Sequence, residues 1–494
     1  MLTFLLLNSK GLVLNMDEIK LEKMKKLRAL KLEPYPYSYN QTHHAQEIEE
    51  HFAKLEGKKV SVAGRIVGMR EMGKLYFIDL LDGSGKIQLI VKSDDIDEKS
   101  QETLKFTDTG DIVGVEGKVA KSKRGATSIE VSTLQILSKS LRFLPEKFHG
   151  LTDVETRYRK RYLDLITNPE VRTIFRNRAR VIKYLRDFLD ERNYLEVDTP
   201  ILQAIYGGAA AKPFVTHHNY LDSDLYLRIA NELYLKRIII GGVERVYEFA
   251  KDFRNEAVDS NHNPEFTQLE FYQAYADYND FMKMVEEMLS GLVKEIKGGH
   301  DIEYQGRKIS FKPPFKRVYL VDEIKKKSGI DISTMDDKSA LKIAKDEKLD
   351  IPMKNAYHVA DALFDKYVQP ELVDPTFVVD FPAYMCPLTK DKRGNPKLSE
   401  RFEMFIAGKE VGNCYSELTD PVEQRAKFAE QEKERKKGDD EAPPIDEDFL
   451  EAVEHGMPPL AGIGLGIDRI VMVLSDVPSL KEVILFPTVK PEKK

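Results

Sequence analysis

The sequence predicts an α+β protein built from a small five-stranded β-barrel and a larger domain of mixed strands and helices. Its 494 residues exceed what one small core accommodates, so two or three domains are expected. Residues 58–138 read as short alternating strands separated by turn residues, whereas helical spacing of apolar residues follows at residues 169–193. The composition, 42% hydrophobic and 32% charged, is that of a globular protein.

Net charge and cysteine content restrict the class of protein. The formal net charge of −6 excludes a globally basic nucleic-acid-binding protein, although a local basic patch is compatible with it. The two cysteines, Cys386 and Cys414, leave no room for a disulfide framework or a cysteine-based zinc site. We therefore expect a reducing, cytoplasmic location.

Residues 1–57 are expected to form an N-terminal extension with a basic helix. The apolar run Phe4–Leu7 lacks a basic flank and is far too short to span a bilayer, so we expect no membrane segment. We interpret residues 1–15 as preceding a start at Met16, with a cleaved signal as the alternative. Residues 16–32 are rich in lysine, which indicates either a solvated surface helix or a mobile basic arm that meets a polyanion.

Residues 58–143 account for the barrel. Apolar and polar residues alternate along five short segments, and a helix-like segment at residues 95–105 follows the third of them. The expected strands lie near residues 60–66, 75–80, 87–91, 111–121 and 129–137. Five short strands with a helix after the third are typical of an OB-fold barrel.

One face of this barrel carries residues suited to nucleic-acid bases. The alternation turns Phe77 and Gln88 outward on the second and third strands, the face that OB-folds use for oligonucleotides. An exposed Phe77 beside Arg65 could stack a base. The alternative interpretation is an isolated surface aromatic.

The larger domain is expected at residues 165–494, after a charged hinge at residues 144–164. Apolar residues at helical spacing predict a helix over residues 169–193, followed by a strand that ends at Pro200. Residues 423–447 are very rich in charge, which predicts an inserted surface helix and a flexible loop.

Two strands of this domain place acids and phenols on a single face. Period-two alternation over residues 267–275 puts Glu270 and Tyr272 on the same side, and residues 413–417 repeat the pattern with Asn413, Tyr415 and Glu417. Buried carboxylates are costly unless they are paired. Two such strands facing one cavity would hold an ammonium group between two acids, which could belong to the protein or to a ligand.

Two further segments indicate a phosphate-binding region. Glu403 and Glu410 offer oxygen ligands for Mg²⁺, although this spacing also fits surface acids. The glycine-rich run before Asp468 and Arg469 permits close approach of the backbone, but it matches neither a dinucleotide fingerprint nor a P-loop. A phosphate site here must therefore rely on arginine.

Three segments in order identify a resemblance. They are YLEVDTPIL, which ends a helix–strand unit, then FRNE with HNPEFTQLEFY, and finally GLGIDRIV. From about Lys58 to Pro491 the chain resembles the class II aminoacyl-tRNA synthetases, and among them the lysyl-tRNA synthetases. The resemblance implies a catalytic domain with an antiparallel sheet flanked by helices, and a homodimer formed through the first motif. It also implies ATP-dependent formation of lysyl-adenylate from L-lysine and transfer of lysine to the 3′ end of tRNA(Lys).

The resemblance also assigns the amino-acid site. Glu270 and Glu417 are expected on the ε-ammonium group of lysine, and Glu232 on the α-amino group. Gly208 would add a backbone contact nearby, and the remaining lysine-binding residues would be Tyr272, Asn413 and Tyr415. The chain differs from many family members at Asn231 and Cys414, and neither difference changes the charge.

The nucleotide site follows in the same way. The expected catalytic residues are Arg254, at the α-phosphate, and Arg469, which would cover the adenine and reach the γ-phosphate. Glu403 and Glu410 would hold Mg²⁺. Further ATP contacts are implied for Glu256, His262, Asn263 and Phe266, with Phe266 stacking the adenine.

The same resemblance implies that the barrel is an anticodon-binding domain, with Phe77, Gln88 and Arg65 as the contact residues. We expect tRNA, L-lysine and ATP as partners and no DNA. Two alternatives remain: a paralogue that transfers lysine to a protein such as elongation factor P, whose members lack the barrel, and a non-catalytic tRNA-binding regulator.

Overall fold

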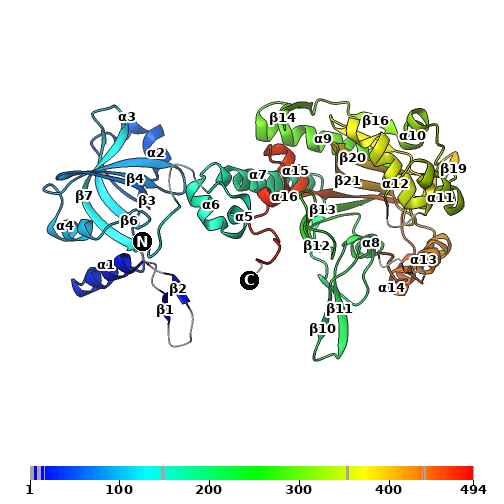
Figure 1. Cartoon of the computed structure of the whole chain (residues 1–494). Helices are drawn as coiled ribbons and strands as arrows, with labels where there is room; N and C mark the ends of the chain where they lie inside the picture. The colour runs from blue at the N-terminus through cyan, green and yellow to red at the C-terminus, as the bar shows by residue number, and fades with distance from the viewer. Residues whose placement is uncertain are drawn as a thin grey trace. The chain divides into compact units, whose positions relative to one another are not determined.

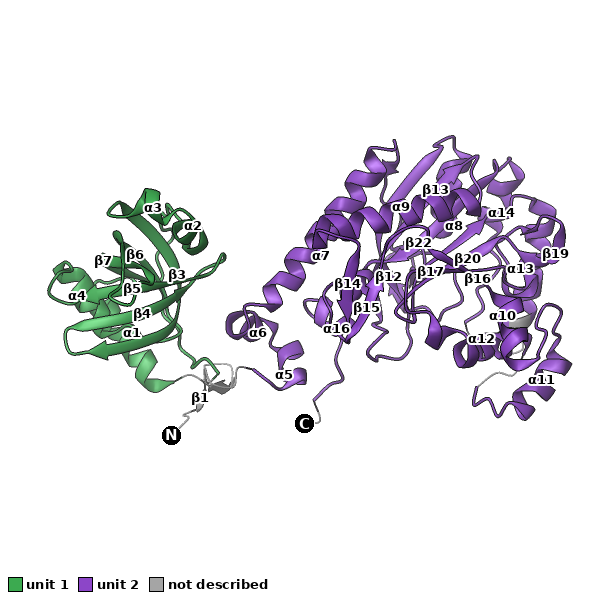
Figure 2. Cartoon of the chain, turned by 90° about the horizontal axis from the view of Figure 1, so that it is seen from above, with its two compact units in different colours: residues 1–150 green, residues 151–494 purple. Residues whose placement is uncertain are grey.

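The computed structural model divides into two compact units, residues 1–150 and 151–494 (Figures 1 and 2). It describes residues 17–145, 151–351, 355–436 and 441–492, together with Gly438 and the backbone of two short paired strands, β1 (Leu5–Leu7) and β2 (Val13–Asn15). The question of a start at Met16 lies outside the described residues, as do parts of the expected hinge and of the charged insertion. Among the described residues, no helix is both long and apolar enough to cross a membrane.

The first unit is a closed five-stranded barrel, as the sequence predicts. The strand order around it is β3-β4-β5-β7-β6, and α4 (Glu98–Lys105) follows the third strand. The barrel strands are β3 (Lys59–Met72), β4 (Leu75–Leu81), β5 (Lys86–Lys92), β6 (Ile112–Lys121) and β7 (Thr127–Ser138). Inward residues such as Ile78 and Leu89 are fully buried because every second side chain points to the interior.

The N-terminal extension packs on this barrel. Helix α1 (Glu18–Ala29) begins at Asp17, whose side chain accepts a hydrogen bond from the Lys20 backbone, and Leu27 joins the barrel core together with Ile48 of α2 (Ala45–Glu50). A short α3 (Phe52–Leu55) leads into the first strand. The expectation of a mobile basic arm is therefore wrong for this helix, because its apolar side and two of its lysines are held by the barrel.

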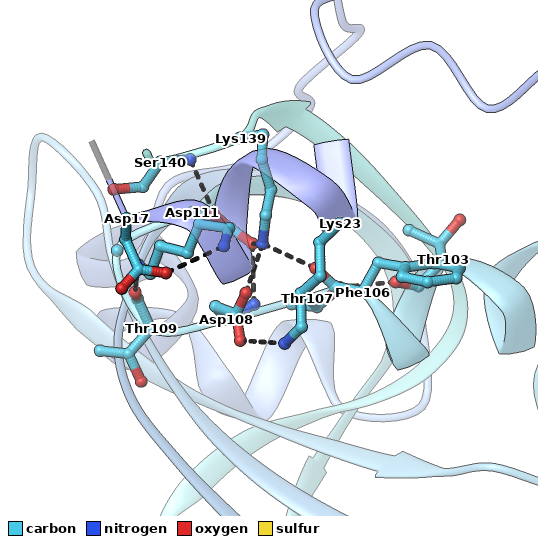
Figure 3. Close-up of polar contacts among 12 residues, drawn as sticks. Asp17, Lys23, Thr103, Phe106, Thr107, Asp108, Thr109, Asp111, Lys139 and Ser140 are labelled. Carbon is cyan, nitrogen blue, oxygen red and sulfur yellow. Dashed lines mark hydrogen bonds and ion pairs between the residues drawn. The ribbon is translucent and has the colours of Figure 1, made fainter. Parts of the chain in front are cut away.

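Those two lysines belong to a cluster that we call the barrel cluster: Lys20, Lys23, Asp108, Asp111 and Lys139. Figure 3 labels all of these residues except Lys20. Lys139 is fully buried and contacts Asp108 at 2.6 Å and Asp111 at 2.8 Å. Lys23 contacts Asp108 at 2.5 Å, and the Lys20 ammonium donates to the Thr109 carbonyl. Basic residues elsewhere on the helix, such as Lys25 and Arg28, stay exposed.

The described part of the expected hinge is helical. It forms α5 (Val154–Arg159) and α6 (Arg161–Thr167), both within the second unit. Arg161 is fully buried, pairs with Asp164 at 2.5 Å and donates to the Leu485 carbonyl. These contacts tie residues 154–164 to the C-terminal part of the chain.

An eight-stranded sheet organises the second unit, in the order β16-β17-β20-β21-β22-β13-β12-β8. Neighbouring strands are antiparallel except for the two edge pairs, which are parallel. The strands are β8 (Leu195–Glu196), β12 (Arg245–Phe253), β13 (Glu265–Ala274), β16 (Lys316–Tyr319), β17 (Thr376–Val379), β20 (Arg401–Ile406), β21 (Lys409–Ser416) and β22 (Leu460–Gly466).

Helices α7 (Val171–Asp190), α9 (Tyr278–Lys297) and α15 (Ile467–Leu474) cover one face of this sheet. Their apolar stripes pack on alternate strand residues such as Leu269, Phe271 and Cys414, which are fully buried. The residues between them, among them Glu270 and Tyr415, turn to the opposite face, as the alternation predicts. That face carries the candidate site.

The remaining elements surround the sheet. They are β9 (Leu202–Gln203), β10 (Val215–His218), β11 (Ser223–Leu227), α8 (Glu232–Ile240), β14 (Asp301–Tyr304), β15 (Arg307–Ser310), α10 (Leu320–Ser328), α11 (Asp337–Asp346), α12 (Ala356–Tyr367), η1 (Gln369–Glu371), η2 (Ala383–Met385), β18 (Asp391–Lys392), β19 (Asn395–Ser399), α13 (Pro421–Lys436), α14 (Glu447–Glu454) and α16 (Leu480–Val483). In the charged insertion, α13 confirms the expected helix.

Candidate active site

A cavity of about 1130 Å³ lies over the polar face of the sheet, with strands β13, β21 and β22 contributing to its wall. The glycines of β22 create room for neighbouring side chains. A Cβ atom at Gly462 would lie 2.0 Å from the Tyr272 ring, and one at Gly464 would lie 2.1 Å from the Gln268 amide. Because both distances are impossible contacts, glycine at these positions lets the side chains of β13 lie flat across the neighbouring strand.

Glu270 is a buried acid of the cavity wall. It is 3% exposed and accepts a hydrogen bond of 2.6 Å from the Tyr272 hydroxyl. Among the described residues, no cationic side chain forms an ion pair with it. Burial, and then the negative charge of Glu232, raise the pKa of Glu270 well above its ordinary value. Such a carboxylate favours the binding of a cation, which would restore its ionised form.

Two other acids of the site already share a cation. Glu232 opens α8, where the helix dipole favours a carboxylate, and Lys236 follows one turn later on the same face. The Lys236 ammonium lies 2.5 Å from Glu232 Oε1 and 2.5 Å from Glu417 Oε2. Glu417 is fully buried, and burial raises its pKa to about 8 although Lys236 opposes this effect.

Arg401 organises the next part of the wall. Its guanidinium pairs with Glu403, donates to the Asn413 amide oxygen at 3.2 Å and lies 5.6 Å from the Tyr415 ring centroid. Burial raises the pKa of Glu403 to about 8, against the opposing effect of Arg401. These contacts hold Glu403, Asn413 and Tyr415 in fixed positions at the cavity surface.

The arginines predicted for phosphate binding both line the cavity. The Arg254 guanidinium lies 5.2 Å from the centroid of the Phe266 ring, and Arg469 donates to the Glu410 carbonyl at 2.7 Å. Asp252 is fully buried on β12, and its carboxylate interacts electrostatically with Arg254. Burial raises the pKa of Asp252 to about 6, although Arg228 and Arg254 oppose the effect.

The loop between β12 and β13 supplies the remaining nucleotide candidates. Glu256, His262 and Asn263 all line the cavity. His262 contacts Asp259 at 2.9 Å, and Asn263 accepts a hydrogen bond of 3.1 Å from the Thr488 backbone. The loop therefore presents polar groups to the cavity while its own residues fix its path.

The structure gathers nearly all predicted residues of the catalytic domain around this one cavity. The residues on its wall are Gly208, Glu232, Arg254, Glu256, His262, Asn263, Phe266, Glu270, Tyr272, Glu403, Glu410, Asn413, Tyr415 and Arg469. Glu417 does not line the cavity, because it lies behind the wall in contact with Lys236.

Sequence reasoning missed three residues, namely Lys236, Arg401 and Gln268. The spacing of four residues between Glu232 and Lys236 on a helix is a signal that could have found the first pair. Likewise, Arg401 and Glu403 lie two apart on one strand, and Gln268 shares the face of Glu270.

The barrel residues are arranged differently from the expectation. Phe77 and Gln88 do point away from the core and are partly exposed. However, strand pairing puts Arg70 directly across from Phe77, whereas Arg65 lies across from Leu81 and donates to the Gly110 carbonyl at 2.7 Å. Arg65 is therefore not beside Phe77, since its partner Leu81 lies farther along β4.

Comparisons with known proteins agree with this geometry. The profile of the tRNA synthetases class II (D, K and N) matches residues 153–490, and that of the OB-fold nucleic acid binding domain matches residues 60–137. The chain is 48% identical to a lysine–tRNA ligase of Clostridium perfringens over 97% of its length and 96% of that protein. It is also 50% identical to the lysine–tRNA ligase of Clostridium acetobutylicum, covering 92% of this chain and 89% of that one. The lysine–tRNA ligase of Moorella thermoacetica is 48% identical, over 96% and 98% of the two chains. The chain belongs to the lysine–tRNA ligase family of the class II aminoacyl-tRNA synthetases.

Proposed function

We propose that this chain joins L-lysine to ATP, forming lysyl-adenylate and diphosphate, and then transfers the lysyl group to the 3′ end of tRNA(Lys). Family membership supports the reaction, and one observation supports the choice of amino acid. Glu270 is buried at the cavity wall, and no described residue provides it with a counter-ion. The ε-ammonium group of lysine would supply that counter-ion, with the Tyr272 hydroxyl orienting the carboxylate.

The first step needs alignment more than proton transfer. The attacking group is the carboxylate of lysine, which is already ionised at neutral pH, so no side chain has to act as a general base. Arg254 would neutralise charge at the α-phosphate. Phe266, whose ring centroid lies 5.2 Å from the Arg254 guanidinium, would stack on the adenine. Arg469 is anchored to the Glu410 backbone and would hold the outer phosphates. Glu256, His262 and Asn263 would complete the nucleotide contacts.

The residues proposed for Mg²⁺ fit that ion. Glu403 and Glu410 both line the cavity, and Mg²⁺ is typically held by one or two carboxylates together with substrate phosphates and water. Among the residues that the structure describes, no three acidic or histidine side chains form a ready metal cage, which agrees with this shared mode. When bound, the ion would neutralise phosphate charge. Arg401 positions Glu403, and Arg469 contacts Glu410 at 3.3 Å.

The barrel supports tRNA over a protein as the acceptor. Phe77 and Gln88 share the partly exposed outer face, where stacking and hydrogen bonding suit unpaired bases of an anticodon. Arg65 would contribute charge on the same unit. We further propose a homodimer and a cytoplasmic location; the two cysteines are unpaired and buried, as expected in a reducing compartment.

The direct test is ATP–pyrophosphate exchange measured with each of the twenty amino acids, followed by lysine transfer to tRNA(Lys). We expect exchange with L-lysine above all others and charging of the tRNA. Exchange without tRNA charging would favour a protein acceptor, and tRNA binding without exchange would favour a non-catalytic regulator. Arg254→Ala should remain folded and lose turnover by roughly 10²-fold or more.

A further inference from the structure

Lys236 is a buried cation that has no assigned role in the proposed reaction. Its side chain is 1% exposed, and its ammonium bridges Glu232 on its own helix and Glu417 at the end of β21. The ring of Tyr272 lies 6.0 Å from the same ammonium. Lys236 therefore contacts two acids of the amino-acid site without lining the cavity itself.

The charges around this lysine form what we call the acid cluster: Glu232, Glu270, Glu417 and Lys236. Among the described residues, Lys236 is the cation that forms ion pairs within this cluster, and Lys390 acts on Glu417 only from a greater distance. With its three carboxylates ionised, the acid cluster carries a charge of −2. L-Lysine brings two ammonium groups, and its carboxylate would face Arg254 outside the cluster.

We propose that Lys236 is a positioning and specificity-determining residue of the amino-acid site. It holds Glu232 and Glu417 in the geometry that the substrate meets, and it sets the charge of the acid cluster to the value that two ammonium groups neutralise. An amino acid with a single ammonium group leaves one buried carboxylate uncompensated, which is costly. This inference rests on the proposed function, because it takes L-lysine as the substrate.

Glu417 gives the inference its geometric support. One of its oxygens contacts Lys236, while Oε1 is buried without a hydrogen-bond partner among the described residues. A fixed carboxylate with an unused acceptor can receive a second cation. Lys236 thus holds Glu417 in a fixed orientation behind the cavity wall.

A double-mutant cycle tests the proposal. Lys236→Met, Glu417→Gln and the double variant are compared by lysine and ATP KM values in pyrophosphate exchange. We expect Lys236→Met to raise the lysine KM roughly 30-fold or more in the wild-type background, but less than about 5-fold in the Glu417→Gln background. The KM for ATP should stay within about 3-fold throughout. The double variant replaces both partners with neutral side chains, so it keeps the test usable if Lys236→Met alone folds poorly.

Lys139→Met is the matched control, because it removes an equally buried lysine from the other unit. It should leave the lysine KM unchanged. Equal effects of Lys236→Met in both backgrounds, or a parallel rise in the ATP KM, would show a packing role only and overturn the proposal. If the wild type itself shows no lysine-dependent exchange, the proposed function fails, a result distinct from an additive cycle in an active enzyme.

Discussion

The barrel cluster and the acid cluster both bury lysine beside carboxylates, but their charges balance differently. In the barrel, Lys23 and Lys139 pair with two aspartates, and both oxygens of Asp111 accept hydrogen bonds from the backbone or Lys139 (Figure 3). In the catalytic unit, two glutamates share one lysine, Glu270 has no ion-pair partner among the described residues, and an oxygen of Glu417 has no hydrogen-bond partner among them.

This difference separates a structural ion-pair network from a binding site. Buried charges are stable only when they are paired and hydrogen-bonded. In the barrel cluster, backbone carbonyls such as that of Thr109 accept hydrogen bonds from the lysines, and these contacts fix α1 to the barrel. The acid cluster keeps a surplus of negative charge at a cavity wall, which a cationic ligand would complete.

The largest expected effect is on Glu270. Glu270→Gln removes the carboxylate that would pair with the ε-ammonium, and losing one partner of a buried pair costs about 3–5 kcal/mol. The lysine KM in pyrophosphate exchange should rise by roughly 10²–10³-fold, with the ATP KM nearly constant. A variant with a near-normal lysine KM would remove the assignment of Glu270 to the substrate.

The matching change in the barrel should affect stability and spare catalysis. Lys139→Met leaves Asp111 fully buried without its main cation, so the barrel should lose about 3–5 kcal/mol of unfolding free energy. Urea unfolding, with limited proteolysis to follow each unit separately, measures this loss of unfolding free energy. Unchanged stability, or a loss of lysine activation in a folded variant, would break the contrast between the two clusters.

The two clusters should also respond to pH in different ranges. The raised pKa of Glu270 favours its protonated form, and the carboxyl must ionise to pair with lysine, whose ε-amino group stays charged until about pH 10. The lysine KM should therefore fall as pH rises above the ordinary titration range of a carboxyl group, while the ATP KM changes less. A flat lysine KM profile would contradict the raised pKa.

The barrel should respond to pH only in a lower range. Burial alone would raise the pKa of Asp108, but hydrogen bonds from Lys139 and Lys23 hold it below its ordinary value. Its contribution to stability is present above the unfolded pKa of about 3.9 and is lost as pH falls through the folded value. Barrel stability should consequently be insensitive to Asp108 between pH 5 and pH 8, in contrast with lysine binding.

The smallest expected effect concerns the outer face of the barrel. Phe77→Ala removes one stacking surface worth about 1–3 kcal/mol, so the KM for tRNA in aminoacylation should rise about 10-fold. Lysine-dependent exchange without tRNA should not change, because Phe77 belongs to the other unit. Impaired exchange in this variant would contradict the separation of the two activities.

Local patterns predict much of this molecule. Period-two alternation places Glu270 and Tyr272 on one face and Cys414 in the core, and the five barrel strands with the helix after the third follow from the same rule. These features depend on neighbouring residues alone, so the sequence is sufficient to find them.

Tertiary contacts account for what the sequence did not predict. Lys236 meets Glu417 because α8 packs on β13, in the same sheet as β21, and this contact across 181 positions is encoded by no local period. The docking of α1 likewise depends on Asp108 and Arg142, far along the chain. Arg65 was misplaced because the register between β3 and β4, which local alternation does not encode, puts it across from Leu81 and not beside Phe77.

Proton release on lysine binding tests the central claim most directly. The acid cluster contains more carboxyl groups than cations. If lysine supplies the missing cations, its binding should lower the raised pKa values of Glu270 and Glu417 and release protons. Calorimetric titration with L-lysine near pH 7, in two buffers of different ionisation enthalpy and with a non-hydrolysable ATP analogue present, measures this release. We predict a binding enthalpy that depends on the buffer in wild type and depends less on it in Glu270→Gln. A wild-type enthalpy that is the same in both buffers would contradict the account.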